Sequence, residues 1–144
     1  MKKQLLVLIL LALTIIPSLA QSDKDSDAIR KVMVEQAAAW NRADIDAFME
    51  IGYWKSEKLK FVSGDRITFG WQQTLENYKK TYSSNELMGK LSFSDLEISV
   101  LSKDAAFVVG SWSLARKQDN PKGKFTLLFR KLKEGWRIVA DHTS

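Results

Sequence analysis

The sequence predicts an α+β fold in which about three N-terminal helices pack on a curved antiparallel sheet. Three observations support this class. Between Ser26 and Tyr82, apolar residues recur mainly at the spacings of three and four that are typical of helices. From Lys90 onward, strand-like segments alternate with short turn signals. The chain has 144 residues and no cysteine, so one core must be stabilised by packing without disulfides.

The first twenty residues have the features of a secretory signal peptide. Lys2 and Lys3 precede an apolar run from Leu5 to Ile16, which is shorter than the roughly 20 residues of a membrane-spanning helix. The small side chains of Ser18 and Ala20 predict cleavage after Ala20. We therefore expect a periplasmic or secreted protein that has no membrane attachment after cleavage. An uncleaved membrane anchor is the alternative.

The predicted mature chain is a short leader followed by a single domain. Residues 21–25 are polar and aperiodic, which is typical of a flexible segment, and the domain covers residues 26–144. Ser26 is the expected cap of a first helix, whose apolar stripe ends at Trp40. Asp44 is the expected cap of a second, shorter helix, so the two helices meet at a tight corner.

A change of pattern after Gly52 predicts two short strands, one around Phe61 and one over Ile67 to Phe69. Gly70 precedes a third helix with a mainly aromatic stripe. Four longer strands follow, separated by turn signals. Their expected bounds are 91–101, 105–117, 124–132 and 136–143. The short connections predict an antiparallel meander.

The strand that begins at Ala105 is apolar on both of its faces. Three helices can cover only one face of such a sheet, so we expect the other face to form a homodimer interface. The alternative is that the leader or a C-terminal strand of the same chain folds over this face.

The charge pattern argues against nucleic acid as a partner. The formal net charge is +5, and it falls to +3 when Lys2 and Lys3 are removed with the signal peptide. The remaining basic residues are interleaved with acidic ones and form no stripe. With one histidine and no cysteine, the chain has no zinc-ligand pattern, and we expect neither a metal nor a cofactor.

The order of these elements, together with the ending Gly-Trp-Arg-Ile-Val-Ala-Asp-His-Thr-Ser over residues 135–144, resembles the nuclear transport factor 2-like superfamily. Within it, the chain looks closest to exported bacterial proteins with a ketosteroid-isomerase-like or SnoaL-like domain of unassigned function. The resemblance implies a cone-shaped fold with a central, largely apolar pocket, commonly in a dimer. It implies no single activity, because this fold hosts many functions.

The resemblance does not carry over the machinery of ketosteroid isomerases. Those enzymes have an oxyanion-donating tyrosine where this chain has Gln36, and an aspartate base where it has Phe61, Val62 and Ser63. Glu57 and Asp65 flank that segment, where strand-end charges are usually solvated. We therefore do not expect isomerase chemistry of that kind.

His142 is the candidate catalytic residue, because histidine exchanges protons near neutral pH and this is the only one. Its neighbour Asp141 should point to the opposite face of the last strand, so only one of the two can enter the pocket. Across the predicted hairpin, His142 should lie near Thr126 or Leu127. The alternative is a structural histidine near the end of the sheet.

Arginine and aromatic residues complete the candidate site. Arg116, Arg130 and Arg137 lie on the last three strands, where a guanidinium group can bind a carboxylate or can simply be solvated. Aromatic side chains of this fold can line the pocket as well as fill the core. The candidate ligand-binding residues are Trp54, Trp71, Tyr78, Trp112, Thr126, Arg130 and Asp141.

Three functional hypotheses follow. We expect a small domain that binds a small, mostly apolar ligand in its pocket. The second hypothesis is a cofactor-free enzyme of the isomerase, dehydratase or cyclase kind that uses His142 as acid or base. The third is a dimeric structural or interaction module.

Overall fold

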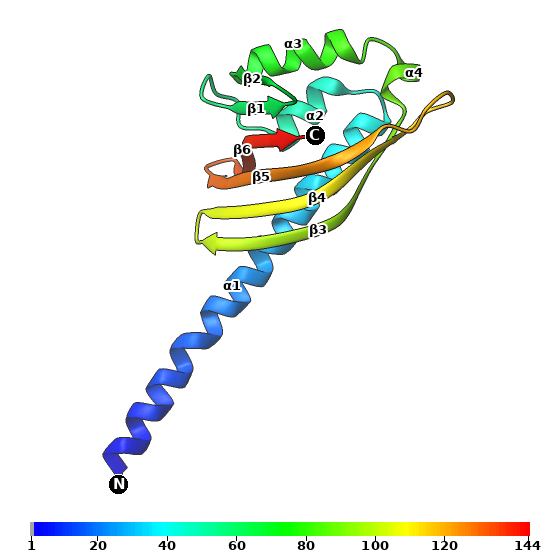
Figure 1. Ribbon diagram of the computed structural model, residues 1–144. Helices are drawn as coiled ribbons and strands as arrows, with labels where there is room; N and C mark the ends of the chain where they lie inside the picture. The colour runs from blue at the N-terminus through cyan, green and yellow to red at the C-terminus, as the bar shows by residue number, and fades with distance from the viewer. Residues whose placement is uncertain (1) are drawn as a thin grey trace.

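A computed structural model describes residues 2–144, with side chains from Gln21 onward (Figure 1). Within this range the α+β prediction is confirmed, with helices packed on one sheet. The elements are α1 (Lys2–Asn41), α2 (Ile45–Gly52), β1 (Lys60–Ser63), β2 (Arg66–Phe69), α3 (Trp71–Thr81), α4 (Asn85–Met88), β3 (Lys90–Ser102), β4 (Ala105–Ala115), β5 (Lys122–Leu132) and β6 (Gly135–Thr143).

The first helix differs from the prediction, because α1 does not begin at Ser26 and no flexible leader is found over residues 21–25. That segment is helical, and Asp25 is only 3% exposed. Its carboxylate accepts hydrogen bonds from Lys131 Nζ at 2.8 Å and from Trp136 Nε1 at 3.3 Å. The prediction of a flexible leader was wrong, because residues 21–25 have no apolar stripe and their helical turn is held by these tertiary contacts instead.

The N-terminal part of α1 projects away from the rest of the domain (Figure 1). The predicted signal peptide falls on residues 1–20, whose side chains lie outside the described part of the chain, and it stays a prediction. Among the described residues, no helix has both the length and the apolar character needed to cross a membrane.

The corner between α1 and α2 forms as the sequence predicts. Asp44 caps α2 by accepting a hydrogen bond from the Ala47 amide at 2.9 Å. Ala43 makes the turn with a φ of 63°. Asn41 then fixes the corner to the sheet, because its side-chain amide bonds both the N–H of Leu91 at 2.7 Å and the carbonyl of Leu91 at 3.0 Å.

The strand order is β2-β1-β6-β5-β4-β3, so the predicted meander of the last four strands is confirmed. The sheet is mixed, however, because β1 pairs with β6 in parallel. In a meander, one edge of the last strand has no partner. Here β1, which comes earlier in the chain, pairs with that edge of β6. The Trp54 amide donates to the Ile138 carbonyl at 3.0 Å, which aligns β1 with the direction of β6.

A β-bulge in β6 decides which side chains face inward. Ile138 pairs with Phe129 and Ala140 pairs with Leu128, so Val139 is an extra residue without a partner. Before the bulge, Trp136 and Ile138 are buried; after it, Asp141 is buried. Without the extra residue, strict alternation would have turned His142 inward instead.

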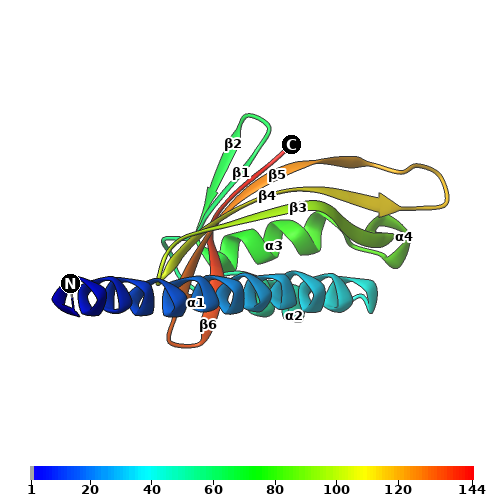
Figure 2. The same ribbon diagram turned by 90° about the horizontal axis from the view of Figure 1, so that it is seen from below.

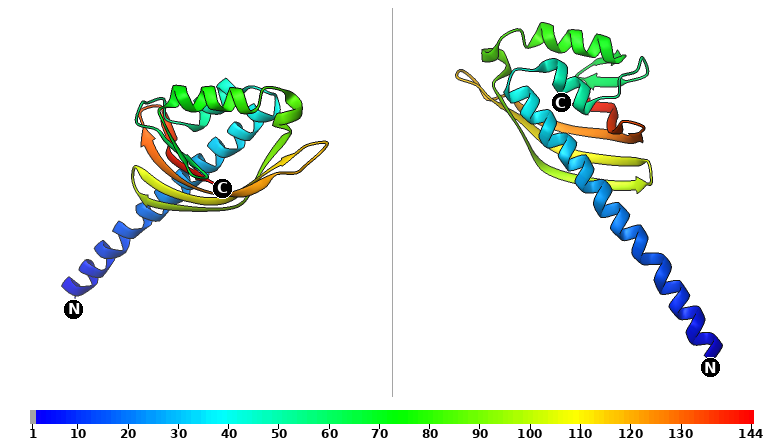
Figure 3. Two further views of the ribbon diagram at one scale, coloured as in Figure 1. Left: turned by 45° about the horizontal axis from the view of Figure 1, so that its top comes forward. Right: turned by 180° about the vertical axis from the view of Figure 1, so that it is seen from behind.

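The helices lie on the concave face of the sheet (Figures 2 and 3). The core fills the space between α1, α2, α3 and this face, and its largest fully buried apolar side chains are Phe129, Ile29, Met33, Met49, Leu59, Ile138 and Val108. The opposite face of the sheet is not covered by the described elements, and Phe107, Val109 and Leu128 are exposed there. The fold therefore has an enclosed concave side and an open outer side.

Candidate functional site

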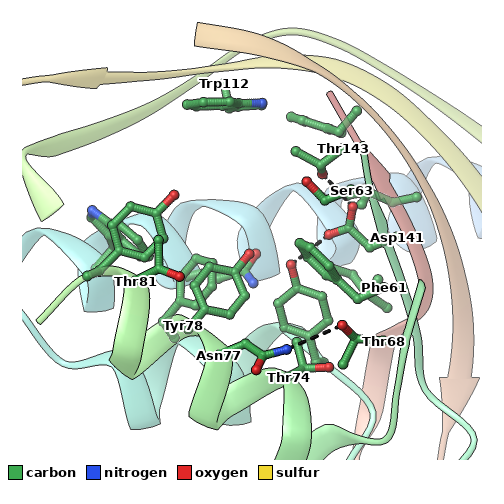
Figure 4. Close-up of a pocket in the computed structure, with 18 of the residues that line it drawn as sticks. Phe61, Ser63, Thr68, Thr74, Asn77, Tyr78, Thr81, Trp112, Asp141 and Thr143 are labelled. Atoms are coloured by element: carbon green, nitrogen blue, oxygen red, sulfur yellow. Dashed lines mark hydrogen bonds between the residues drawn. The ribbon is translucent and has the colours of Figure 1, made fainter. Parts of the chain in front are cut away.

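A cavity of about 1060 Å³ lies between the concave face of the sheet and the helices (Figure 4). Its wall is largely aromatic, and it includes Trp40, Phe48, Tyr53, Phe61, Tyr78 and Trp112. Trp112 spans the side of the cavity opposite Tyr78 (Figure 4), and its indole N–H donates to the Ser144 carbonyl at 3.1 Å. The volume and the lining are comparable to those of pockets that bind small organic molecules in other proteins.

A polar cluster around Asp141 lies in this aromatic wall. The Tyr53 hydroxyl donates to Oδ2 of Asp141 at 2.7 Å, and the Thr143 hydroxyl donates to Oδ1 at 2.5 Å (Figure 4). Asp141 is only 4% exposed, but it lines the cavity. Both carboxyl oxygens are therefore held in place, one by the last residue of β6 and the other by the residue that follows α2.

The environment of this cluster changes its acid–base properties. Burial raises the pKa of Asp141 to about 6, although the hydrogen bonds from Thr143 and Tyr53 and the nearby charge of His142 act in the opposite direction. Burial and the negative charge of Asp141 also raise the pKa of Tyr53 and of Tyr78. The two phenols remain protonated near neutral pH, whereas the carboxyl group can gain or lose a proton there.

Gln36 is a second buried polar residue in the cavity wall. It is 1% exposed, and its Nε2 atom has no hydrogen-bond partner among the described residues. The amide occupies the space that Gly52 leaves, because a Cβ atom on Gly52 would clash with Nε2 of Gln36. The wall therefore contains one unpaired donor, at the position where the resemblance would place a tyrosine.

Three of the predicted site residues line the cavity: Tyr78, Trp112 and Asp141. Of the two neighbouring residues on the last strand, Asp141 faces the cavity and His142 does not. His142 pairs with Thr126, which is one of the two partners expected from the hairpin. His142 is exposed, and both residues lie on the outer face of the sheet. His142 is therefore not placed to act on a molecule in the cavity.

The other predicted residues also lie outside the cavity lining. Trp71 is buried in the first turn of α3, where its indole N–H donates to the Met49 carbonyl at 3.2 Å. Trp54 is half-buried in the loop between α2 and β1. Arg130 points outward and forms a 2.7 Å ion pair with Asp104. These three residues stabilise the fold or are solvated.

The two remaining arginines have local partners. Arg116 lies 5.9 Å from the ring of Tyr82 and 3.6 Å from the carboxylate of Asp119. Arg137 donates to the carbonyl of its neighbour Trp136 at 2.8 Å. Neither guanidinium group lines the cavity.

Sequence reasoning missed Tyr53 and Thr143, the two hydrogen-bond partners of Asp141. Thr143 could have been found, because residues two apart on a strand share a face. Tyr53 could not, since it lies 88 positions from Asp141 and only the fold brings them together. Among the described residues, no group of three or more acidic or histidine side chains could hold a metal ion.

A family model and a similar solved structure assign the chain to the same kind of domain. Residues 29–144 match the family model of the SnoaL-like domain. No curated protein matches the chain. A nuclear transport factor 2-like protein of unknown function from Shewanella oneidensis is 45% identical, with a TM-score of 0.79 over 83% of this chain and 98% of that chain.

More distant structures share the fold. A nuclear transport factor 2-like superfamily protein from Salmonella enterica is 20% identical, with a TM-score of 0.65 over 89% of this chain and 92% of that one. A protein from Streptomyces avermitilis, described as a candidate dehydratase of the nuclear transport factor 2-like family, is 18% identical. Its TM-score is 0.69 over 85% of this chain and 96% of that chain.

Proposed function

The chain belongs to the SnoaL-like domain family of the nuclear transport factor 2-like superfamily, and we propose that it binds a small, mostly apolar molecule in its cavity. The observation that carries this proposal is the contrast between an aromatic wall and one buried polar cluster at Asp141. Apolar surface supplies affinity, and a few placed polar groups supply orientation. A ligand with one hydroxyl or carbonyl oxygen fits this contrast.

The chemistry of the cluster decides how such an oxygen is held. Below a pH of about 6 the carboxyl group of Asp141 is protonated and donates a hydrogen bond; above it, the carboxylate accepts one. The hydroxyl of Tyr78 lines the same wall as a further donor. A ligand carbonyl is therefore best matched by the protonated site, and a ligand hydroxyl by the ionised one.

Thermal unfolding tests the proposal with a panel of apolar ketones and alcohols and their matched hydrocarbons. The oxygenated compounds should raise the Tm more than the hydrocarbons do, because they pair the buried polar cluster. The Trp112→Ala variant, which removes part of the wall, should lose most of this shift. Trp54→Ala, outside the cavity, is the matched control. The proposal fails if no compound shifts the Tm, or if both variants keep the full shift.

A second candidate function is acid–base catalysis of the isomerase, dehydratase or cyclase kind, with Asp141 in the role expected for His142. It is supported by the raised pKa of Asp141 and by the 2.7 Å hydrogen bond from Tyr53. In such a reaction, the carboxylate removes a proton from the carbon beside a ligand carbonyl. The phenol of Tyr78 stabilises the enolate oxygen that forms.

Deuterium exchange separates binding from catalysis. A ketone that binds is incubated with the protein in D₂O, and the NMR signal of its α-protons is followed. Catalysis predicts faster loss of that signal with the wild type than with Asp141→Asn, while a binding protein leaves the exchange rate at its buffer value. His142→Gln should behave like the wild type in either case.

A further inference from the structure

The cavity opens to solvent where the residues that line it are exposed. Most of the exposed lining residues belong to two segments, the β1–β2 hairpin and the second half of α3: Asp65, Arg66, Ile67, Asn77, Lys80 and Thr81. By contrast, Met33 on α1 lines the same cavity and is only 1% exposed. Figure 4 shows Thr81 on one side of the cavity and Ser63 on the other. A molecule from solvent therefore reaches the cavity between the hairpin and α3, and we call this opening the mouth.

One side-chain hydrogen bond joins the two sides of the mouth. Nδ2 of Asn77 on α3 donates to Oγ1 of Thr68 on β2 at 3.3 Å, and both residues line the cavity (Figure 4). The Asn77 amide is itself held, because its Oδ1 atom accepts a hydrogen bond from Nε2 of Gln73 one turn earlier at 3.1 Å. Among the described residues, no other side-chain hydrogen bond or ion pair links β2 to α3.

Packing contributes little to the contact between β2 and α3. The two large apolar side chains of β2, Ile67 and Phe69, are 58% and 60% exposed, so they bury little surface. β2 is also the edge strand of the sheet and pairs only with β1. The hydrogen bond between Thr68 and Asn77 is therefore a large part of what holds β2 against α3.

The two ends of β2 differ in how firmly they are held. After its last residue, the Gly70 amide donates to the Leu59 carbonyl at 2.9 Å, and the Trp71 amide donates to the Ser56 carbonyl at 3.0 Å. Before its first residue, Gly64 makes the turn with a φ of 59°, and a Cβ atom there would have no other atom within 4 Å. β2 can therefore tilt away from α3 about its Gly70 end, while the turn moves through open space.

We propose that the Thr68–Asn77 hydrogen bond limits the size of the molecules that enter the cavity, because it holds the two sides of the mouth together. Small molecules enter while the bond is formed. Bulky molecules enter only when it breaks and β2 tilts away from α3. An exposed hydrogen bond between neutral groups contributes little net free energy, so it slows bulky molecules by roughly two- to tenfold and does not exclude them. Access by this route is the same whether the protein binds its ligand or converts it.

A reporter thiol tests this route in the ligand-free protein. The chain has no cysteine, so Met33→Cys places a single thiol in the wall of the cavity. Its labelling rates are measured with iodoacetamide, which is small, and with pyrene maleimide, which is bulky. Val108→Cys is the matched control, because Val108 is fully buried but does not line the cavity, so its labelling needs unfolding. The thiol at position 33 should react faster than the thiol at position 108 with both reagents.

Variants of the two bonded residues, made on the Met33→Cys background, test the hydrogen bond itself. Asn77→Ala and Thr68→Val should each speed labelling by pyrene maleimide roughly two- to tenfold, and labelling by iodoacetamide by less than about twofold. The double variant should be no faster than the faster single variant, because both changes remove the same bond. Gln72→Ala, at an exposed position of α3 outside the cavity lining, should change neither rate.

The other outcomes overturn the proposal. If the thiol at position 33 reacts no faster than the thiol at position 108, molecules do not enter the folded protein through the mouth. If Asn77→Ala leaves the rate with pyrene maleimide unchanged, or raises both rates equally, the bond does not select by size. Additive effects of Asn77→Ala and Thr68→Val would mean that the two residues do not act through one bond. Thermal unfolding of each variant shows that it is folded.

Discussion

The hydroxyl of Tyr53 donates a 2.7 Å hydrogen bond to the carboxyl group of Asp141, although the two residues lie 88 positions apart. Tyr53 directly follows α2, and Asp141 lies near the end of the last strand. The bond lies in the wall of an aromatic cavity, and both residues are only 4% exposed. Both the stability and the proposed chemistry of the domain depend on this contact.

Asp141 should make the protein less stable as the pH rises. Its pKa is raised in the folded state from 3.8 to about 6, so the folded state favours the protonated form. The stabilisation that Asp141 contributes to the free energy of unfolding is therefore fully present below about pH 4. It is lost as the pH rises through about 6. The expected loss is about 3 kcal/mol, from roughly two pKa units.

Urea denaturation at a series of pH values checks this, with Asp141→Asn as the variant that cannot ionise. The difference in stability between the wild type and Asp141→Asn should change between pH 4 and pH 7, in favour of the variant. His142→Gln, which removes the neighbouring imidazole on the outer face of the sheet, should keep the wild-type trend. A pH-independent difference between the wild type and Asp141→Asn would contradict the raised pKa.

Tyr53→Phe should destabilise the fold by about 1–2 kcal/mol, because a buried carboxyl group loses its donor. The pKa of Asp141 should rise further, since the hydrogen bond from Tyr53 lowers it. Both effects are measurable by denaturation and by NMR titration of the carboxyl carbon. Tyr82→Phe, on the same cavity wall, is the matched control and should leave the pKa of Asp141 unchanged.

Asp25→Ala should show that residues 21–25 belong to the folded domain. Burial raises the pKa of Asp25, but hydrogen bonds from Lys131, Gln21 and Trp136 outweigh it and hold the pKa below its usual value. Losing these contacts should lower the free energy of unfolding by about 2 kcal/mol at neutral pH. The wild-type advantage should fade only as the pH falls below 3.8, through the lowered pKa.

Asp23→Ala is the control for this experiment, because Asp23 lies in the same helical segment but is exposed. It should change the stability by less than about 0.5 kcal/mol. If Asp25→Ala is as mild as Asp23→Ala, the segment is not anchored as the structure has it.

Gln36→Leu should leave the protein as stable as the wild type or more stable by about 1 kcal/mol, because it removes a buried donor without a partner. Thermal and urea unfolding measure this directly. Gln72→Leu, at an exposed position of α3, controls for the change in side-chain type. A clear loss of stability in Gln36→Leu alone would mean that the amide has a partner in solution.

Export and cleavage form a separate prediction, made from the first twenty residues. When the full chain is expressed in a bacterial host, the intact mass of the protein should correspond to a chain that begins at Gln21. Replacing Ala20 with Arg should block this processing, because signal peptidase requires a small residue there. An unprocessed wild-type protein would contradict the signal peptide.

The sequence predicted the fold class and most of the elements because their signals are local. Apolar spacing marked the end of α1 at its corner, the Asp44 cap marked α2, and turn residues separated the last four strands. It missed α4, which is only one helical turn. It also placed a flexible leader where Asp25 is anchored, since that contact depends on residues more than a hundred positions away.

The candidate site was only partly predictable, for the same reason. Tyr78 and Trp112 could be chosen as wall residues because aromatic side chains of this fold can line the pocket as well as fill the core. Trp54 and Trp71 look the same in sequence, but the structure uses them elsewhere. Tyr53 carries no signal of its own, and only packing brings it to Asp141.

By itself, the sequence determined that one of Asp141 and His142 would enter the cavity and that the other would face away, because neighbouring side chains on a strand alternate. Only the tertiary structure decided which. The extra residue at Val139 shifts the alternation by one position, and it arises from the pairing of β6 with β5. That shift places a carboxyl group in the cavity and leaves the histidine on the outer face of the sheet.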